Sequence, residues 1–189
     1  RHDFKLGYNA ADLTYVDNDE HATTQEVYSL WKGLAGVEGK AIISYGDILY
    51  KKYIPTTLLE MEGDFAIAVD TNWKESYERG RYTDFAACDK RHAKHLFDQK
   101  VVLKGMGNSL PEDMISGEWV GLLAVSPRGL HLMKDVLREL AEKENFRHTR
   151  MADLFRELIQ RGQEIRVFYT SGHWLDVDEI KDLSKAGSF

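Results

Sequence analysis

Apolar and polar residues follow one another along the chain in short runs that predict alternating strands and helices. The runs at residues 40–45 and 65–70 are continuous in apolarity, as expected for strands that are covered on both faces. Apolar residues three and four positions apart predict amphipathic helices over residues 27–34, 130–140 and 151–160. Because strands alternate with helices, the pattern predicts one α/β domain over residues 1–189 with a mostly parallel sheet.

Local signals refine this pattern. The segment from Thr23 to Glu26 matches a capping box, and Ser126-Pro127 supplies a cap and a first-turn proline, so helices are expected to begin at both places. Further short strands are predicted at residues 13–16, 101–103, 119–125, 164–169 and 173–176. The other expected elements are a helix at 56–61, a turn at 105–108, a last helix at 177–185, and loops with edge strands over 71–98.

Two carboxylates follow predicted strands that lie far apart in the sequence. Asp47, preceded by Gly46, comes directly after an apolar strand, and Asp176 ends the segment 173–176. Ligands of open α/β sheets bind outside the carboxyl ends of the strands, so we expect the two side chains to meet at one rim. Mg²⁺ prefers a few carboxylates together with waters and phosphate oxygens, and the pair therefore predicts a metal-bound phosphate. The alternatives are that Asp47 caps the segment after it and that Asp176 caps a final helix, and Asp178 competes with Asp176 for either role.

Composition limits the classes of function. The chain has 189 residues, 43% of them hydrophobic, which indicates a globular domain with a core of its own. A net charge of -6 without a basic stripe disfavours nucleic-acid binding. The single cysteine, Cys88, excludes an internal disulfide and a cysteine-based zinc cluster, and a cytoplasmic location is expected. No apolar run reaches membrane-spanning length, and the chain starts without a signal peptide or an initiator Met, so we expect no membrane partner and a fragment or processed product.

Other side chains near predicted strand ends are candidates for binding a substrate. Asp70 ends the 65–70 strand, where it serves either a ligand or a strand-end turn. Glu118 beside Trp119 suits a cationic group, and the alternative is a solvated acid next to a core ring. His173 lies in the expected crevice. A weaker alternative is a zinc site on one helical face, without further visible ligands: Asp89, His92 and His95.

Short motifs occur in a fixed order along nearly the whole chain: Tyr15-Val16-Asp17-Asn18, Ala22-Thr23-Thr24, Tyr28-Ser29-Leu30-Trp31, Ser44-Tyr45-Gly46-Asp47-Ile48, Ile67-Ala68-Val69-Asp70 with Trp73, Gly117-Glu118-Trp119-Val120-Gly121 and Gly172-His173-Trp174-Leu175-Asp176-Val177. In this order they resemble the nucleotidyltransferases of the phosphocholine and phosphonate cytidylyltransferase type. The nearest likeness is the nucleotidyltransferase domain that is fused behind phosphoenolpyruvate mutase in phosphonate biosynthesis.

The resemblance implies a Rossmann-like α/β/α nucleotidyltransferase sheet of the GT-A-like kind. It places the catalytic, metal-binding acids at Asp47 and Asp176, with Mg²⁺ as the cofactor. The residues expected at the substrate are those of the matching segments and of the crevice: Thr24, Ser29, Tyr45, Asp70, Trp73, Glu118, Trp119 and His173. Such enzymes open with a strand and a Gly-rich loop that holds the triphosphate, and this sequence lacks that unit. We therefore expect an incomplete sheet at the N-terminus, a homodimer that pairs the exposed edges, and an upstream mutase domain.

The expected reaction is Mg²⁺-dependent transfer of a cytidylyl group from CTP, or of the corresponding group from another NTP, with release of pyrophosphate. The expected acceptor is a small phosphonate such as 2-aminoethylphosphonate, or phosphocholine, since Glu118 beside Trp119 suits an amine. One alternative is transfer to a sugar 1-phosphate. The other is a non-catalytic α/β module for binding or assembly.

Overall fold

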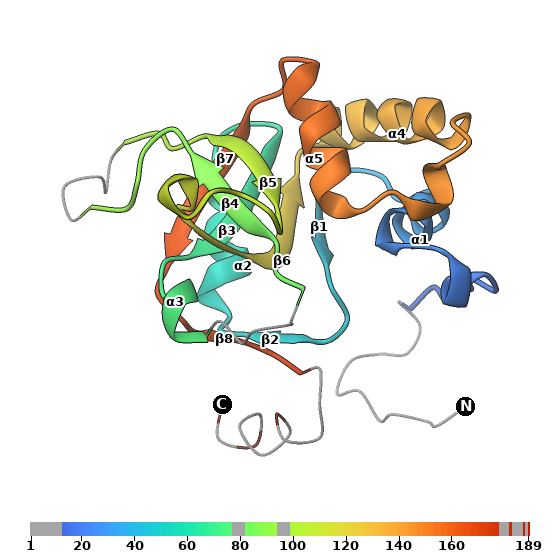
Figure 1. The fold of residues 1–189 in the computed structure, drawn as a ribbon. Coiled ribbons are helices and arrows are strands. Elements are labelled where there is room, and N and C mark those ends of the chain that lie inside the picture. The colour runs from blue at the N-terminus through green and yellow to red at the C-terminus, as the bar shows by residue number, and fades with distance from the viewer. Residues whose placement is uncertain (1–12, 77–81, 94–98, 178–181, 183–186, 188) are drawn as a thin grey trace.

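The computed structural model describes residues 13–76, 82–93, 99–177, 182, 187 and 189 (Figure 1). Its α-helices are α1 (Glu26–Gly33), α2 (Tyr53–Glu60), α3 (Trp73–Ser76), α4 (Pro127–Ala141) and α5 (Met151–Gln160), and its short 3-10 helices are η2 (His21–Thr23), η3 (Glu112–Met114) and η4 (Phe146–His148). Its strands are β1 (Ala41–Ser44), β2 (Ile48–Tyr50), β3 (Phe65–Asp70), β4 (Phe85–Cys88), β5 (Leu103–Gly107), β6 (Gly117–Val125), β7 (Ile165–Thr170) and β8 (Trp174–Asp176).

Six strands form one mixed sheet in the order β5-β4-β6-β3-β7, with β1 also paired to β6. Only β3 and β7 run parallel among the described strands of this sheet, and the remaining pairs are antiparallel. The expectation of a mostly parallel sheet is therefore wrong. Parallel neighbours need a crossover helix, and the described residues between β4, β5 and β6 contain no α-helix. Strands β2 and β8 form a separate antiparallel pair.

Both faces of the sheet are covered by other elements. The side chains of β3 point alternately to the two faces and join a different apolar cluster on each. Phe65, Ile67 and Val69 join the cluster that contains the apolar faces of α1, α4 and α5, whereas Ala66 and Ala68 join the cluster of α2 and β2. All six residues of β3 are buried, as expected for a strand covered on both faces. Figure 1 shows α1, α4 and α5 together on one side of the sheet, and the second cluster places α2 on its other face, which confirms the predicted α/β fold class.

Helix α4 forms where its local signals place it. The Ser126 side chain accepts a hydrogen bond from the Gly129 N–H (2.9 Å), which satisfies one free donor of the first turn. The predicted apolar stripe is buried along its length: Leu130, Met133, Leu137 and Leu140. The chain therefore encodes this helix through both its cap and its period. None of the helices in the described part of the chain has the length and apolar character needed to cross a bilayer.

The capping box predicted before α1 does not form, although the helix does. Gln25 is the N-cap and makes no side-chain cap. The Glu26 carboxylate instead accepts a hydrogen bond from the Met151 N–H (2.8 Å) at the start of α5. This long-range contact joins α1 to α5. Strand β1, expected to be covered on both faces, is only half-buried and ends in the exposed Ser44.

Three other expectations are corrected. Residues 13–16 form no strand, and Tyr15 is 81% exposed there, so these apolar residues have no described sheet to join. The turn expected at 105–108 belongs largely to β5, because Gly105 and Gly107 pair with β4. Strand β4 is internal rather than an edge, since it lies between β5 and β6. The helix expected at 177–185 lies mostly outside the described residues; of those described, Val177 is not helical and Asp182 is helical, so this helix stays a prediction.

Candidate active site

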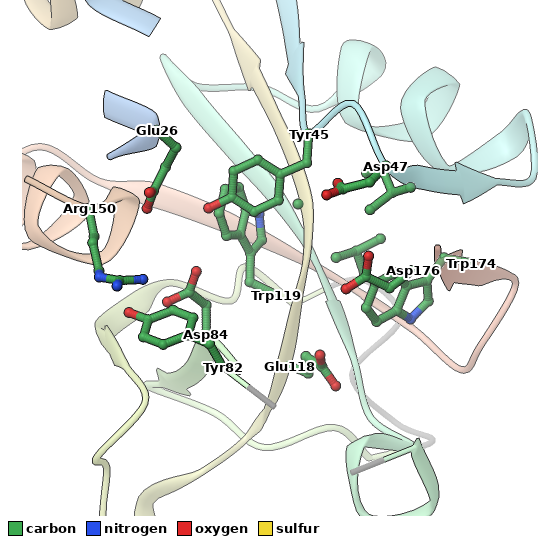
Figure 2. Close-up of a pocket in the computed structure, with 13 residues that line it drawn as sticks. Glu26, Tyr45, Asp47, Tyr82, Asp84, Glu118, Trp119, Arg150, Trp174 and Asp176 are labelled. Atoms are coloured by element: carbon green, nitrogen blue, oxygen red, sulfur yellow. The ribbon is translucent and has the colours of Figure 1, made fainter. Parts of the chain in front are cut away.

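A pocket opens where two strands share one edge of β6. Strand β1 ends there, with the Tyr45 N–H donating to the Gly121 carbonyl (3.1 Å), and β4 begins there, with the Trp119 N–H donating to the Asp84 carbonyl (2.9 Å). Strands β1 and β4 therefore separate along this edge of β6, and a cavity of about 340 Å³ lies between them (Figure 2). Ligands of open α/β sheets bind outside the carboxyl ends of strands, and the carboxyl end of β1 lies at this pocket. The lining residues are Glu26, Tyr45, Asp47, Ile48, Tyr82, Asp84, Glu118, Trp119, Val120, Gly121, Arg150, Trp174 and Asp176.

Gly121 shapes this pocket through an irregularity in β6. The register between β3 and β6 shifts between the pairs Ile67–Leu123 and Val69–Trp119. Gly121 lies in the shifted segment with φ +81, a conformation that side-chain-bearing residues rarely adopt. A Cβ atom on Gly121 would lie 2.8 Å from the Tyr45 ring. Glycine is therefore required here for the Tyr45 ring to lie against the strand, and such irregularities often occur next to active sites.

Asp47 and Asp176 reach this pocket together, on the side of β2 and β8. Ile48 and Asp176 are paired residues of the two strands, and the Val177 N–H donates to the Asp47 carbonyl (2.9 Å). Both side chains line the pocket, and Figure 2 shows their carboxylates facing its same part. The two acids therefore meet at one rim, as the sequence leads us to expect, and their role as metal ligands remains a prediction.

The chemistry of this pair fits a hard divalent cation. The Asp47 side chain is exposed and makes no hydrogen bond or ion pair with any residue in the described ranges. Those ranges hold no group of three His, Cys, Asp or Glu side chains arranged around one metal position. Mg²⁺ needs no such cage, because it is commonly held by one or two carboxylates and completes its shell with waters and phosphate oxygens. Asp47 and Asp176 are the residues that would hold it.

Two aromatic rings form the wall between the two ends of the pocket. Tyr45 and Trp119 meet edge to face with ring centroids 5.1 Å apart, and Trp119 meets Phe155 of α5 in the same way, also at 5.1 Å. The Trp119 indole N–H donates to the Leu122 carbonyl (2.9 Å), so the ring is fixed in place. Glu118, which is 3% exposed, lines the pocket below this wall. The predicted pair Glu118 and Trp119 therefore reaches the pocket.

Four charged or polar side chains gather at the other end of the pocket: Glu26, Tyr82, Asp84 and Arg150. Burial, and then the nearby Glu26 carboxylate, raise the pKa of Asp84 to about 6. The Tyr82 hydroxyl and the Arg150 guanidinium offset this effect in part. The Arg150 guanidinium lies 4.2 Å from the centroid of the Tyr82 ring. This end of the pocket combines a buried acid, a second acid, a cation and aromatic surface.

Asp70 holds the loop before β8 instead of lining the pocket. Its Oδ1 accepts from the Asn72 and Gly172 N–H groups, both at 2.9 Å, and its Oδ2 accepts from the Trp174 indole N–H (2.7 Å). Asp70 is 2% exposed, so its environment is that of a strand-end turn. Because Trp174 lines the pocket two residues before Asp176, Asp70 positions the segment that carries this acid.

The remaining predicted site residues also lie outside the lining of the pocket. Thr24 and Ser29 accept hydrogen bonds from the Asn18 amide at 3.1 and 2.9 Å. Trp73 packs edge to face on Phe85 of β4. His173 has φ 65 and lies 2.8 Å from the Tyr53 hydroxyl through its Nδ1, which ties the loop before β8 to α2. The sequence places all four near the crevice, and the structure places none of them among the residues that line the pocket.

The sequence interpretation missed Glu26, Tyr82, Asp84 and Arg150. Ligand-binding acids are expected at the carboxyl ends of strands, whereas Asp84 lies directly before the amino end of β4. The sequence signal for Asp84 is an acid at the amino end of an apolar run. The zinc alternative is not supported by the described part of the chain, since residues 89–93 are not helical and the Asp89 carboxylate accepts from the Val102 N–H (2.8 Å). His95 lies outside the described residues.

Comparison with known proteins places the chain next to nucleotidyltransferases. No family model matches the sequence. The chain is 24% identical over 157 residues to a CTP:phosphoglutamine cytidylyltransferase from Campylobacter jejuni, a match that covers 75% of this chain and 56% of that protein. It therefore spans little more than half the length of this curated relative.

Solved structures show the same likeness in three dimensions. The inositol-1-phosphate CTP transferase from T. maritima superposes with a TM-score of 0.66 at 17% identity, over 90% of this chain and 62% of that chain. A nucleoside-diphosphate-sugar pyrophosphorylase from Vibrio cholerae RC9 superposes with a TM-score of 0.52 at 16% identity, over 85% of this chain and 64% of that chain. The chain therefore has the α/β fold of these nucleotidyltransferases, over somewhat less than two thirds of their length.

Proposed function

We propose that the pocket belongs to a Mg²⁺-dependent cytidylyltransferase, which joins CMP from CTP to a small acceptor that bears a phosphonate or phosphate group. The observation that carries this proposal is the convergence of Asp47 and Asp176 on one pocket in the fold of a CTP transferase. The name of the C. jejuni relative supports CTP as the nucleotide and a phosphorylated acceptor. 2-Aminoethylphosphonate and phosphocholine are the acceptors proposed first, since the pocket offers carboxylates and ring faces to a cation.

The chain's own residues orient the reactants in this proposal. An oxygen of the acceptor's phosphonate or phosphate group forms a bond to the α-phosphorus of CTP, and the bond from that phosphorus to the oxygen of the leaving pyrophosphate breaks. No side-chain nucleophile is needed. Asp47 and Asp176 hold the cation, which when bound neutralises negative charge on the phosphates. The rings of Trp119 and Tyr45 form the wall against which the acceptor lies. Asp70 keeps the Asp176 segment in place through its hydrogen bond from Trp174.

A sugar 1-phosphate is the second candidate acceptor. The V. cholerae neighbour carries the name of a nucleoside-diphosphate-sugar pyrophosphorylase. A sugar presents neutral hydroxyl groups, which pair well with carboxylates but do not require two acidic side chains such as Glu26 and Asp84, which line this pocket. The charge of the pocket therefore favours an acceptor that carries an amine.

Pyrophosphate release tests the proposed reaction. The assay combines CTP and Mg²⁺ with 2-aminoethylphosphonate, phosphocholine or glucose 1-phosphate, and it is run on the 189-residue chain and on the longest product of its gene. We expect release that depends on an amine acceptor, stops with EDTA, and falls about a hundredfold or more in Asp47→Asn and Asp176→Asn. The control is Asp113→Asn, which replaces an exposed carboxylate outside the pocket. Release that is unchanged in both aspartate variants, or found only with glucose 1-phosphate, contradicts the proposal.

A further inference from the structure

A buried carboxylate oxygen faces the part of the pocket that the metal chemistry does not use. Asp84 is 8% exposed, and its Oδ1 has no hydrogen-bond partner within the described ranges. A buried acceptor without a donor is costly, and native proteins keep few of them. Asp84 lines the pocket, so a ligand bound there can supply the missing donor.

The surroundings of Asp84 suit an ammonium group. Glu26 is the second carboxylate of this end of the pocket, and its Oε1 already accepts from the Met151 N–H, which fixes its position. Tyr45 and Tyr82 line the same end, and the Tyr45 hydroxyl offers a further oxygen acceptor to an ammonium. Figure 2 shows both carboxylates and the Tyr45 hydroxyl directed into one space. An ammonium with three donors can satisfy Asp84 and Glu26 together.

Arg150 adds a site for an anion beside this space. Its guanidinium packs on the Tyr82 ring, and it makes no ion pair with a carboxylate in the part of the chain that the structure describes. Packing on the ring fixes the plane of the guanidinium, and a fixed plane favours bidentate binding of a carboxylate. The backbone N–H of Arg150 donates a hydrogen bond to the Asp153 carboxylate (3.0 Å), which fixes the backbone at this position.

We infer that Asp84, Glu26 and Arg150 bind the zwitterionic end of the acceptor, with the ammonium between the two acids and a carboxylate on the arginine. This inference rests on the proposed function and narrows its acceptor to a phosphorylated or phosphonylated amino acid. The phosphorus end of such a molecule extends past the Tyr45 and Trp119 wall toward Asp47 and Asp176. The amine alone, as in 2-aminoethylphosphonate, uses half of the site.

Three phosphate esters separate the contributions of the two charged groups. O-Phospho-L-serine carries an ammonium and a carboxylate, O-phosphoethanolamine carries only the ammonium, and glycerol phosphate carries neither. Calorimetric binding to the 189-residue chain with Mg²⁺ and without nucleotide should follow that order, with about tenfold or more between neighbours. O-Phospho-D-serine has the same charges in the mirror arrangement. It should bind less tightly than the L form, because three fixed contacts distinguish enantiomers whereas net charge does not.

Two variants should remove the two preferences separately. Asp84→Asn keeps the shape of the side chain and should abolish the preference for phosphoethanolamine over glycerol phosphate. Arg150→Met should abolish the preference for phosphoserine over phosphoethanolamine, and Arg150→Lys, which keeps the charge without the fork, should restore it only in part. Asp113→Asn, outside the pocket, should change neither preference. Tryptophan fluorescence and urea unfolding check that each variant is folded.

The outcomes separate this inference from the reaction. Equal binding of the three esters, no binding of any of them, or preferences that survive both variants overturn the zwitterion site, whatever the pyrophosphate assay gives. Tighter binding of glucose 1-phosphate than of phosphoserine also overturns it. If the preferences hold as stated and CTP is not consumed with any acceptor, the zwitterion site stands and the proposed reaction fails.

Discussion

Replacing Asp84 with Asn tests the electrostatics of the pocket while keeping the size of the side chain. Burial, and then the Glu26 carboxylate, raise the pKa of Asp84 from its ordinary value of 3.8 to about 6. The folded state therefore binds a proton more tightly than the unfolded chain does, and the free energy of unfolding falls as pH rises between these two values. Above this range the ionised Asp84 costs about 3 kcal/mol, at about 1.4 kcal/mol per pKa unit.

Asp84→Asn removes this pH-dependent cost. We expect the variant to be more stable than the wild type at about pH 8, and its advantage to shrink by about 2 kcal/mol at about pH 4.5. Any pH-independent difference between Asn and Asp cancels in this comparison. The free energy of unfolding is measured by urea titration at each pH, with tryptophan fluorescence as the signal. The other charged and titratable groups that line this end of the pocket, Glu26, Tyr45, Tyr82 and Arg150, are unchanged.

Two further variants control this experiment. Glu26→Gln removes the second cause of the raised pKa while keeping an oxygen for the Met151 N–H, so it should reduce the pH-dependent gain of Asp84→Asn. Asp113→Asn replaces an exposed acid and should show no pH-dependent difference from the wild type. A gain of Asp84→Asn that is the same at all pH values, or that is larger at low pH, refutes the electrostatic reasoning. A stabilised variant that binds phosphoethanolamine less tightly would show that Asp84 is kept for its ligand.

Three more substitutions have definite expected outcomes. Asp70→Ala leaves three partly buried donors without their acceptor, so the free energy of unfolding should fall by about 3–5 kcal/mol in urea titration, and a loss below about 1 kcal/mol would contradict the role of this acid. Gly121→Ala should cost about 1–3 kcal/mol and alter the near-UV circular dichroism, because a Cβ meets the Tyr45 ring, whereas Gly36→Ala, with open space around it, should do neither. Ser126→Ala should lower the stability by about 1 kcal/mol through the lost cap of α4, and an unchanged thermal midpoint would exclude that contribution.

The helices are predictable from the sequence because their signals are local. The bounds of α5 are those expected, and α4 begins at the predicted cap. The capping box at Thr23 fails for a tertiary reason, since Glu26 binds the start of α5 instead of its own helix end. Strand direction is also a tertiary property, and the sequence cannot show that β4 pairs with both β5 and β6.

The site is predictable from the sequence only in part, because five of the expected residues line the pocket and the end formed by Glu26, Tyr82, Asp84 and Arg150 was not expected: the five are Tyr45, Asp47, Glu118, Trp119 and Asp176. Asp47 and Asp176 each follow an apolar run, and the β2–β8 pair brings them together as expected. Asp84 and Arg150 precede a strand and a helix, respectively, and reach the pocket because β4 starts where β1 ends on the edge of β6. That arrangement depends on the antiparallel pairing, which the sequence interpretation did not foresee. Asp70 belongs to one of the motifs of the expected site, but it contributes through hydrogen bonds to the loop before β8 and not by lining the pocket.

The central claim is that Asp47 and Asp176 hold one cation together. Calorimetric titration of CTP with Mg²⁺ into the wild type, Asp47→Asn, Asp176→Asn and the double variant tests it most directly. The claim predicts that each single variant binds about tenfold or more weakly, that the double variant binds no more weakly than the weaker single variant, and that EDTA abolishes the differences, because both residues act through the same ion. Losses that add in the double variant, or single variants that bind as the wild type does, would contradict it.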